Sequence, residues 1–353
     1  MCMITFDWED NDAKNKFKNF GSSGTIAWAI IDITEACNFN CKWCFANAAS
    51  KREPRYMEMQ TLEMLLERLK DAGVRQVTYS GGEPTLHPRL REAVELASRH
   101  SMIVHMNTNG YLLTKAMAKE LKSLGLSQVQ INIDSVEKGK HDAIRGKKGS
   151  FERALEALKN SMEAGITCVS ETVLTKHNEG EITDIFRLAR SMGIQRCRVW
   201  DMTPSSGCAR DNSELLPSDY ISTLQQVADF ARQEGAKHIE IGDPLFLSHV
   251  SSELQKSGGY CAFAMGMIVY IATNGDVFFC CTLRDRMYNI LEEIGKGNDI
   301  RTVHRDAIKR YLERFSEADA CKSCKEYKRC QGGCYTRRDF SSDNSDYLCK
   351  MRV

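Results

Sequence analysis

CNFNCKWC, residues Cys37–Cys44, follows directly on an apolar, β-prone run over residues 25–34. Its three cysteines have the spacing CxxxCxxC, and cysteine sets of this kind after a strand are typical of metal ligands. Three thiolates are one fewer than a structural zinc ion or a closed iron–sulfur cluster uses, so a metal group held here keeps one coordination position open. The stretch therefore predicts a metal centre that can bind a further ligand.

An alternation of strands and helices continues along the chain. Short apolar or alternating runs predict strands over residues 25–34, 76–80, 103–108, 128–134, 167–174 and 196–202. Apolar residues at helical spacing predict helices over 59–72, 88–100, 114–124, 151–164, 181–192 and 218–233. Six strand–helix units in series predict an α/β fold with a parallel sheet, either open or closed fully or partly into a barrel.

Polar and glycine-rich stretches lie at the carboxyl ends of the first four predicted strands. They are Cys37–Cys44, Ser80–Pro84, Asn107–Gly110 and Asn132–Ser135. Because the carboxyl ends of parallel strands meet at one edge of such folds, these stretches predict a single site. By the same reasoning, residues 200–210 after the sixth strand are expected to line a substrate cavity.

Charge and composition exclude some classes of partner. The 353 residues carry 48 Lys and Arg against 47 Asp and Glu, so neither nucleic acid nor a membrane surface is an expected partner. The sequence shows no membrane-length apolar stretch and no signal peptide, and we expect a cytoplasmic protein. In a reducing compartment, 15 cysteines indicate metal or redox chemistry rather than disulfides. Cys168 and Cys197 lie in apolar runs and are expected to be buried small hydrophobes.

Composition divides the chain into three parts. Residues 1–24 are polar, end in a Gly-Ser-Ser-Gly stretch and are predicted to be a flexible segment. Residues 25–240 carry the strand–helix units. Residues 241–353 are predicted to be a bridging region and a cysteine-rich domain, in which the Asn274-Gly275 turn between the apolar runs 267–272 and 277–281 predicts a hairpin.

An aromatic residue, Trp43, precedes the third cysteine, and Gly81-Gly82-Glu83-Pro84 follows the next predicted strand. Together with CxxxCxxC, this combination resembles the radical S-adenosylmethionine (SAM) superfamily. The resemblance implies a partial (β/α)6 TIM-like barrel in which Cys37, Cys41 and Cys44 hold a four-iron four-sulfur (4Fe-4S) cluster. SAM then chelates the fourth iron through its amino and carboxylate groups, which is what the open coordination position requires.

The resemblance also implies cofactor-binding residues. These are Trp43 near the adenine, Gly81, Gly82 and Glu83 at the SAM amino group, Asn132 at the ribose, and Arg145 at the carboxylate or ribose, with Asn107, Asn109 and Asp134 as further candidates. For Arg145 the alternative is a surface ion pair with Glu137 or Asp142. For Asp134 the alternative is a loop cap.

The C-terminal cysteines have a spacing of their own. The series begins with Cys261, which is separated by thirteen residues from Gly275 and then by four more from Cys280. It continues as Cys321-x2-Cys324-x5-Cys330-x3-Cys334 and ends at Cys349. This series resembles the SPASM domain with its two auxiliary 4Fe-4S clusters. The family's interleaved ligation gives one cluster a full set: Cys321, Cys324, Cys330 and Cys349. The other receives Cys261, Cys280 and Cys334, and either Cys281 closes it or it stays open to water or substrate. A zinc ribbon is the alternative for the whole series.

The function implied is reductive cleavage of SAM to a 5′-deoxyadenosyl radical, which abstracts hydrogen from a substrate. The first hypothesis for the substrate is a ribosomal peptide or protein, matured by crosslinking, epimerisation or oxidation. The second is a small molecule, namely a sugar, a nucleoside or a tetrapyrrole. A zinc-binding module without catalysis is a third hypothesis, of another class.

Three cofactor clusters of the 4Fe-4S type and SAM are thus expected, with an electron donor such as flavodoxin or ferredoxin. Relatives that modify peptides often carry a leader-binding domain, which residues 1–24 are too short to form, so a separate leader-peptide-binding protein is a candidate partner. Sulfatase-maturating relatives have an Asp directly after the GxxxxC cysteine, where this chain has Cys281. Cys281 is either a hydrogen donor to a substrate radical, as in an epimerase, or a buried bystander.

Overall fold

Strand β1 (Trp28–Thr34) is buried along its whole length and lies inside the sheet, paired in parallel with β2 (Gln76–Gly81) and β8 (Ile268–Ile271). Burial on both faces explains why its sequence, WAIIDIT, is almost continuously apolar. The computed structural model describes residues 25–194, 196–203, 216–234, 239–241, 261–315, 319–325, 327–330, 332–342 and 344–349. The predicted flexible segment 1–24 and residues 242–260 of the predicted bridging region lie outside the described residues.

The sheet has ten strands. The others are β3 (Ile103–Thr108), β4 (Leu126–Asn132), β5 (Thr167–Leu174), β6 (Arg196–Asp201), β7 (Ile239–Ile241), β9 (Asp276–Phe278) and β10 (Arg286–Asn289). The order is β10-β9-β8-β1-β2-β3-β4-β5-β6-β7, and β1 to β7 are parallel. Because β10 and β7 are the two ends of this order, the barrel is not closed. The prediction of an α/β fold with a partial barrel is confirmed.

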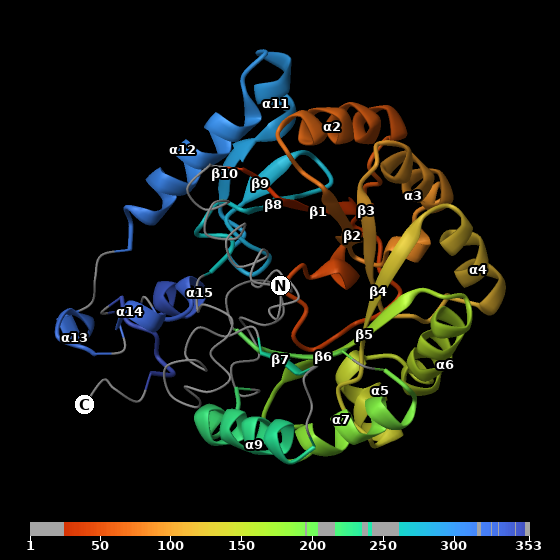
Figure 1. Cartoon of the computed structure of the whole chain (residues 1–353), viewed down its shortest axis with the longest axis vertical. Coiled ribbons are helices and arrows are strands. Elements are labelled where there is room, and N and C mark those ends of the chain that lie inside the picture. The colour runs from red at the N-terminus through yellow and green to blue at the C-terminus, as the bar shows by residue number, and fades with distance from the viewer. Residues whose placement is uncertain are drawn as a thin grey trace.

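Helices follow the parallel strands. They are α2 (Met59–Asp71), α3 (Leu90–Arg99), α4 (Lys115–Ser123), α5 (Lys138–Arg145), α6 (Ser150–Glu163), α7 (Ile182–Ser191) and α9 (Tyr220–Gln233), with short 3-10 helices η1 (Ala48–Ser50) and η2 (Pro84–Leu86). Figure 1 shows α2, α3, α4, α6 and α7 in an arc outside the strands, as crossover connections between parallel strands require. The six predicted helices are confirmed. Helix α5 was not predicted, because its sequence KGKHDAIR has few apolar residues.

Side chains alternate between the two faces of the strands. Val77, Met106 and Ile131 pack in the main apolar core with the outer helices. Cys168 and Cys197 belong to the same core and are almost fully buried, as predicted. The alternate positions face the interior of the barrel and are mostly polar, namely Thr78, Ser80, His105, Asn107, Gln128, Gln130, Asn132, Glu171, Arg196 and Arg198.

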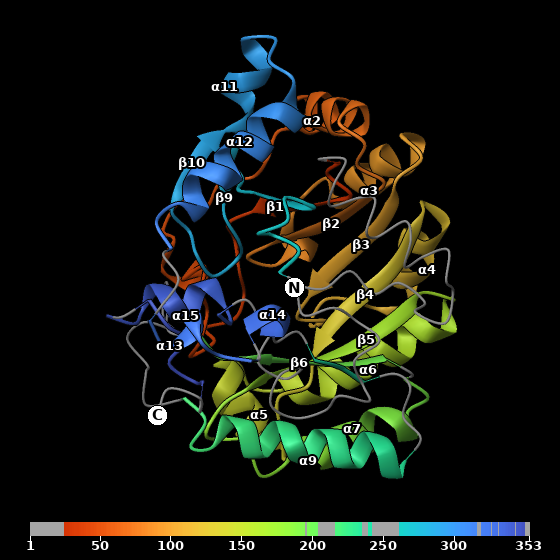
Figure 2. The same cartoon turned by 60° about the vertical axis from the view of Figure 1, so that its left-hand side comes forward.

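The C-terminal part continues the barrel sheet before it forms small helices. The predicted hairpin is present as β8 and β9, and a second apolar core joins Trp28 and Ile30 of β1 to Phe263, Tyr270 and Phe279. The helices are α11 (Ile290–Gly295), α12 (Ile300–Leu312), α13 (Asp319–Lys322), α14 (Tyr327–Cys330) and α15 (Tyr335–Asp339). Figures 1 and 2 agree that α13 to α15 lie between α12 and α9. Within the described residues, no helix combines the length and the apolar character needed to cross a membrane.

Candidate active site

The loop after β1, which carries the CxxxCxxC cysteines, lies against the loop that follows β2. The N–H of Gly82 donates to the carbonyl oxygen of Thr34 at 2.8 Å, and the N–H of Glu83 donates to that of Ala36 at 2.7 Å. A Cβ atom on Gly81 would lie 2.1 Å from the Thr34 oxygen, and one on Gly82 would lie 2.1 Å from the Ala36 oxygen. Glycine is thus required at both positions because the cysteine loop approaches them closely, whether or not a ligand also binds there.

Two further hydrogen bonds fix the cysteine loop. The side-chain amide of Asn109 donates to Oδ1 of Asn38 at 2.7 Å, and the N–H of Lys42 donates to the carbonyl oxygen of Ile144, at the end of α5, at 3.2 Å. The loop is therefore held by the ends of β2 and β3 and by α5, so the predicted meeting of the strand-end loops is confirmed.

Burial determines the protonation of two of the loop's thiols. The pKa of Cys37 is raised to about 11 and that of Cys41 to about 12, mainly by burial and in smaller part by the charge of Cys44. Cys37 and Cys41 are therefore neutral at pH 7 and lose protons on binding metal. Within the described part of the chain, no three His, Cys, Asp or Glu side chains converge on a point that would hold one metal ion. A 4Fe-4S cluster needs no such convergence, since each thiolate binds a different iron.

Glu83 joins the loops after β2 and β3 through its buried carboxylate. Its Oε1 accepts hydrogen bonds from the N–H and hydroxyl of Thr85 and from the hydroxyl of Thr108, at 3.0, 2.7 and 2.6 Å. Its Oε2 accepts one from the N–H of Asn109 at 2.7 Å. Oε2 therefore accepts fewer hydrogen bonds than Oε1 and can accept one more donor, and Glu83 lines the cavity described below.

Arg145 is buried and pairs with Asp134, so the alternative of a surface ion pair with Glu137 or Asp142 is wrong. Its guanidinium lies 3.3 Å from Oδ2 of Asp134 and over the rings of Phe39 and Trp43. Asp134 does not line the cavity described below and accepts the N–H of Val173 through Oδ1. Burial raises the pKa of Asp134 to about 6, although Arg145 opposes the shift. Asp134 thus pairs with Arg145 from behind the cavity wall, and its predicted contact with the cofactor stays a prediction.

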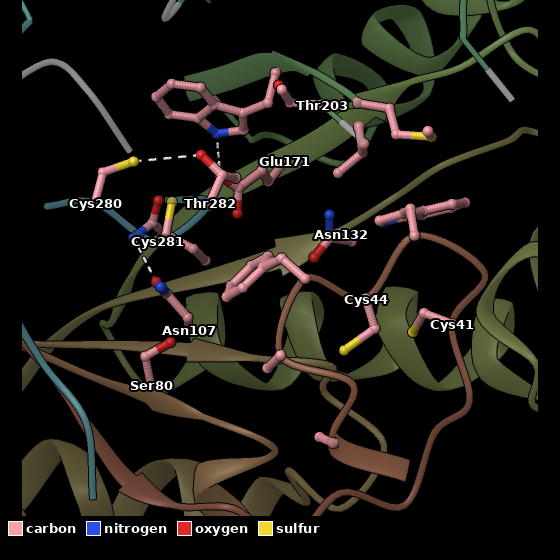
Figure 3. A pocket seen from close by; sticks show the side chains of 18 of the residues that line it. Cys41, Cys44, Ser80, Asn107, Asn132, Glu171, Thr203, Cys280, Cys281 and Thr282 are labelled. Atoms are coloured by element: carbon pink, nitrogen blue, oxygen red, sulfur yellow. Dashed lines mark hydrogen bonds between the residues drawn. The ribbon is translucent and has the colours of Figure 1, made fainter. Parts of the chain in front are cut away.

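One cavity, of about 260 Å³, is lined by residues of both the N-terminal cysteine loop and the C-terminal cysteine region. Its wall includes the three cysteines of the CxxxCxxC set. Of the C-terminal cysteines it includes Cys261, Cys280, Cys281 and Cys334. Figure 3 shows Cys41 and Cys44 on one side of the cavity and Cys280 and Cys281 on the other, with Asn132 between them. Trp43, Gly81, Gly82, Glu83, Asn107, Asn109 and Arg145 also line it.

Cys280 has an environment that favours the thiolate. Burial raises its pKa, but hydrogen bonds from Cys281, Thr282, the N–H of Leu283 and Thr336 outweigh burial and hold the pKa at about 6. The sulfur lies 3.3 Å from both the Thr282 hydroxyl and the Leu283 nitrogen. A thiolate is the form that binds metal.

The remaining C-terminal cysteines form a second group, away from the cavity wall. Cys324 and Cys349 lie close enough to Cys330 for their charges to raise its pKa, which burial has already raised. The N–H of Cys324 donates to the carbonyl oxygen of Cys321 at 3.1 Å.

Comparison with known proteins identifies the family. The family model of the radical SAM superfamily matches residues 31–189. Mycofactocin maturase MftC of Mycobacterium ulcerans (strain Agy99) is 31% identical over 329 residues, which cover 90% of this chain and 86% of that protein. The chain belongs to the radical SAM superfamily. The AdoMet-dependent heme synthase of Methanosarcina barkeri (strain Fusaro / DSM 804) is 26% identical over 92% of this chain and 93% of its own length.

Solved structures show the same fold. Streptococcus suis SuiB bound to S-adenosylmethionine has a TM-score of 0.73 and 19% identity, covering 96% of this chain and 81% of its own. SuiB bound to its precursor peptide SuiA has a TM-score of 0.72 and 17% identity, covering 99% and 82%. Radical SAM proteins bind SAM and a 4Fe-4S cluster. The donors present here suit both, because three cysteine thiols, an arginine and a carboxylate with spare accepting capacity line one cavity.

Several residues of the cavity wall were not predicted. Of the predicted stretch 200–210, Trp200 near the end of β6 and Thr203 just after it line the cavity, while residues 204–210 lie outside the described residues. Glu171 and Arg337 carried no motif. Strand alternation alone places Glu171 on one of two faces, and only the fold brings Arg337 to Asp201, 136 residues earlier, at 2.8 Å.

Proposed function

We propose that Cys37, Cys41 and Cys44 hold the 4Fe-4S cluster and that SAM binds beside them. The support is the cavity at the carboxyl ends of the strands, where these thiols face Glu83 and Arg145. Glu83 has one accepting position for the SAM amino group, and the buried guanidinium of Arg145 suits its carboxylate. Trp43 and Asn132 supply an aromatic face and a polar group for the adenosine.

The C-terminal part is proposed to be a SPASM domain with two further 4Fe-4S clusters. The group around Cys330 supports one, on Cys321, Cys324, Cys330 and Cys349. Cys261, Cys280 and Cys334 share the cavity wall and support the other, in which one iron is left for Cys281, water or substrate. Cys281 also lines the cavity, so its proposed role as hydrogen donor is compatible with its position.

The function that the site supports best is maturation of a ribosomal peptide or protein by crosslinking, epimerisation or oxidation. One observation carries it: a single cavity is lined at one end by the CxxxCxxC cysteines and at the other by C-terminal cysteines. When bound, the cluster and SAM supply the 5′-deoxyadenosyl radical that removes hydrogen from the substrate. The similarity to a mycofactocin maturase over most of the chain supports a peptide substrate. Flavodoxin or ferredoxin is the proposed electron donor, and a separate protein could present the leader peptide.

A small molecule is the second candidate substrate. The similarity to an AdoMet-dependent heme synthase, also over most of the chain, favours it. Among the small molecules considered from the sequence, a tetrapyrrole gains most from this relative.

The chemistry is tested on anaerobically reconstituted protein. We expect about twelve irons per chain and formation of 5′-deoxyadenosine from SAM and dithionite. C41A should abolish 5′-deoxyadenosine, whereas C168A, which removes a buried thiol of the apolar core, should retain it. Colourless, zinc-loaded protein without SAM cleavage would contradict the proposal and favour the zinc-binding module.

The substrate class is tested by mass spectrometry. The enzyme, SAM and reductant are incubated with any short peptide encoded beside its gene, and separately with tetrapyrroles. A change in peptide mass that requires SAM supports maturation. Turnover of a tetrapyrrole with an unchanged peptide would favour the small-molecule function.

A further inference from the structure

Glu171 places a carboxylate on the cavity wall that none of the predicted roles uses. It lies on β5, next in register to Asn132 on β4 and to Arg198 on β6. The indole N–H of Trp200 donates to its Oε1. Figure 3 shows Glu171 among the side chains that line the cavity, together with Asn132, Cys41 and Cys44.

The arginines of the cavity wall are neutralised by aspartates. Arg145 pairs with Asp134, and Arg337 pairs with both Asp201 and Asp346. Neither guanidinium forms an ion pair with Glu171 in the structure.

Glu171, in contrast, makes no ion pair with any residue that the structure describes. Its register neighbour Arg198 donates to the side-chain oxygen of Gln130 and lies over the ring of Trp200, 5.8 Å from its centre. A carboxylate on a cavity wall can accept several hydrogen bonds, because each of its oxygens has two lone pairs, and Glu171 is only partly buried. Its second oxygen is thus ready for a group that enters the cavity.

We propose that Glu171 recognises a cationic group of the substrate, an ammonium or guanidinium carried by a peptide. The inference rests on the proposed peptide-maturing function and specifies that the peptide substrate carries a positive charge. Trp200 fixes one carboxylate oxygen and presents an aromatic face beside it, and cations are attracted both to such faces and to carboxylates in low dielectric. Phe45, Tyr270 and Phe279 line the same cavity and suit the alkyl stem of a lysine or arginine side chain.

The test compares two acetylated and amidated Gly-Gly-Lys-Gly-Gly peptides, one with free lysine and one with Nε-acetyl-lysine. Their affinities are measured by anaerobic calorimetry on reconstituted, SAM-loaded enzyme. E171Q keeps the side-chain size and can still accept the Trp200 N–H through its amide oxygen. E67Q is the matched control, since Glu67 is exposed on α2. SAM affinity and 5′-deoxyadenosine formation without peptide are measured for each protein.

We expect wild type and E67Q to bind the lysine peptide about tenfold more tightly than its acetylated form, and E171Q to bind the two within about twofold. SAM affinity should be the same in all three proteins. Equal binding of the peptides by wild type, no binding of either, or a preference retained by E171Q would overturn the inference. Weaker SAM binding by E171Q would also overturn it, assigning the carboxylate to the cofactor. Absence of 5′-deoxyadenosine in wild type, in contrast, would count against the proposed function itself.

Discussion

Gly82 is the residue on which the position of the CxxxCxxC cysteines depends most directly. In G82A the new methyl group would meet the Ala36 carbonyl oxygen at 2.1 Å, and backbone cannot yield as a flexible side chain does. We expect the cysteine loop to shift and the protein to lose about four irons per chain. G139A is the control, because Gly139 lies on α5 with open space around its Cα. Iron analysis after reconstitution measures both, and full iron content in G82A would refute the proposed role of this contact.

Asp134 acts on the cofactor site through Arg145. In D134N the buried guanidinium loses its counter-charge, and we expect it to move or to bind SAM with about tenfold lower affinity. Asp142 offers a matched control, because its carboxylate accepts the N–H groups of Gly149 and Phe151 and does not pair with Arg145. D142N should weaken the start of α6 without changing SAM binding. Equilibrium dialysis with SAM separates the two, and equal affinities in D134N and wild type would contradict the positioning role.

At the scale of elements, His304 links α12 to β10 through a 3.0 Å hydrogen bond between its Nδ1 and the Tyr288 hydroxyl. Burial lowers its pKa from 6.5 to about 4, so the folded protein keeps His304 neutral where the unfolded chain takes up a proton. Its contribution to stability is therefore complete above pH 6.5 and declines as the pH falls. Between pH 7 and pH 5, wild type should lose about 2 kcal/mol more unfolding free energy than H304L.

Anaerobic urea unfolding at pH 7, 6 and 5 measures this difference. H177N is the control, since His177 is exposed and its loss should leave the pH dependence unchanged. If the unfolding free energies of wild type and H304L fell equally between pH 7 and pH 5, His304 would not be the source of this pH dependence. His105 and His141 are also buried with lowered pKa values, so the comparison between variants, not the wild-type slope, isolates His304.

Elements whose apolar residues form a clear pattern along the sequence were predictable. Elements defined by tertiary contacts were not. Strands β3 and β5 have the predicted bounds: buried and less buried residues alternate along β3, and β5 is a short, largely apolar run. Strand β4 ends two residues before the predicted end, since Asp134 turns away to accept the N–H of Val173 and to meet Arg145. Helix α5 lacks an apolar face and was not predicted, although its end holds the cysteine loop.

The same distinction applies to the site. Motifs at strand ends led to Cys37, Glu83 and Asn109, because the parallel sheet brings such ends together without further information. Glu171 has no such signal. It lies within a strand, and its use depends on which face is inward and on Trp200 from the next strand.

At the scale of the whole molecule, Arg337 holds the C-terminal cysteine region on the barrel. Its side chain is fully buried, its Nε lies 2.8 Å from the Asp346 carboxylate, and one of its terminal nitrogens lies 2.8 Å from Oδ2 of Asp201 at the end of β6. Asp346 also accepts the N–H of Cys334 at 2.8 Å. The same ion pairs therefore connect the barrel rim to a cysteine that faces the cavity.

Removing Arg337 should detach these two parts from each other. In R337M, the buried Asp346 and the partly buried Asp201 lose their partner, and breaking a buried pair costs about 3–5 kcal/mol. We expect faster amide hydrogen exchange in residues 332–342 and 344–349 and at the end of β6, with β1 to β4 unchanged. R314M is the control, because Arg314 is exposed and its pairs with Asp285 and Asp339 contribute little. Unchanged exchange in R337M, or an equal increase throughout the barrel, would show that these ion pairs do not couple the C-terminal region to the barrel.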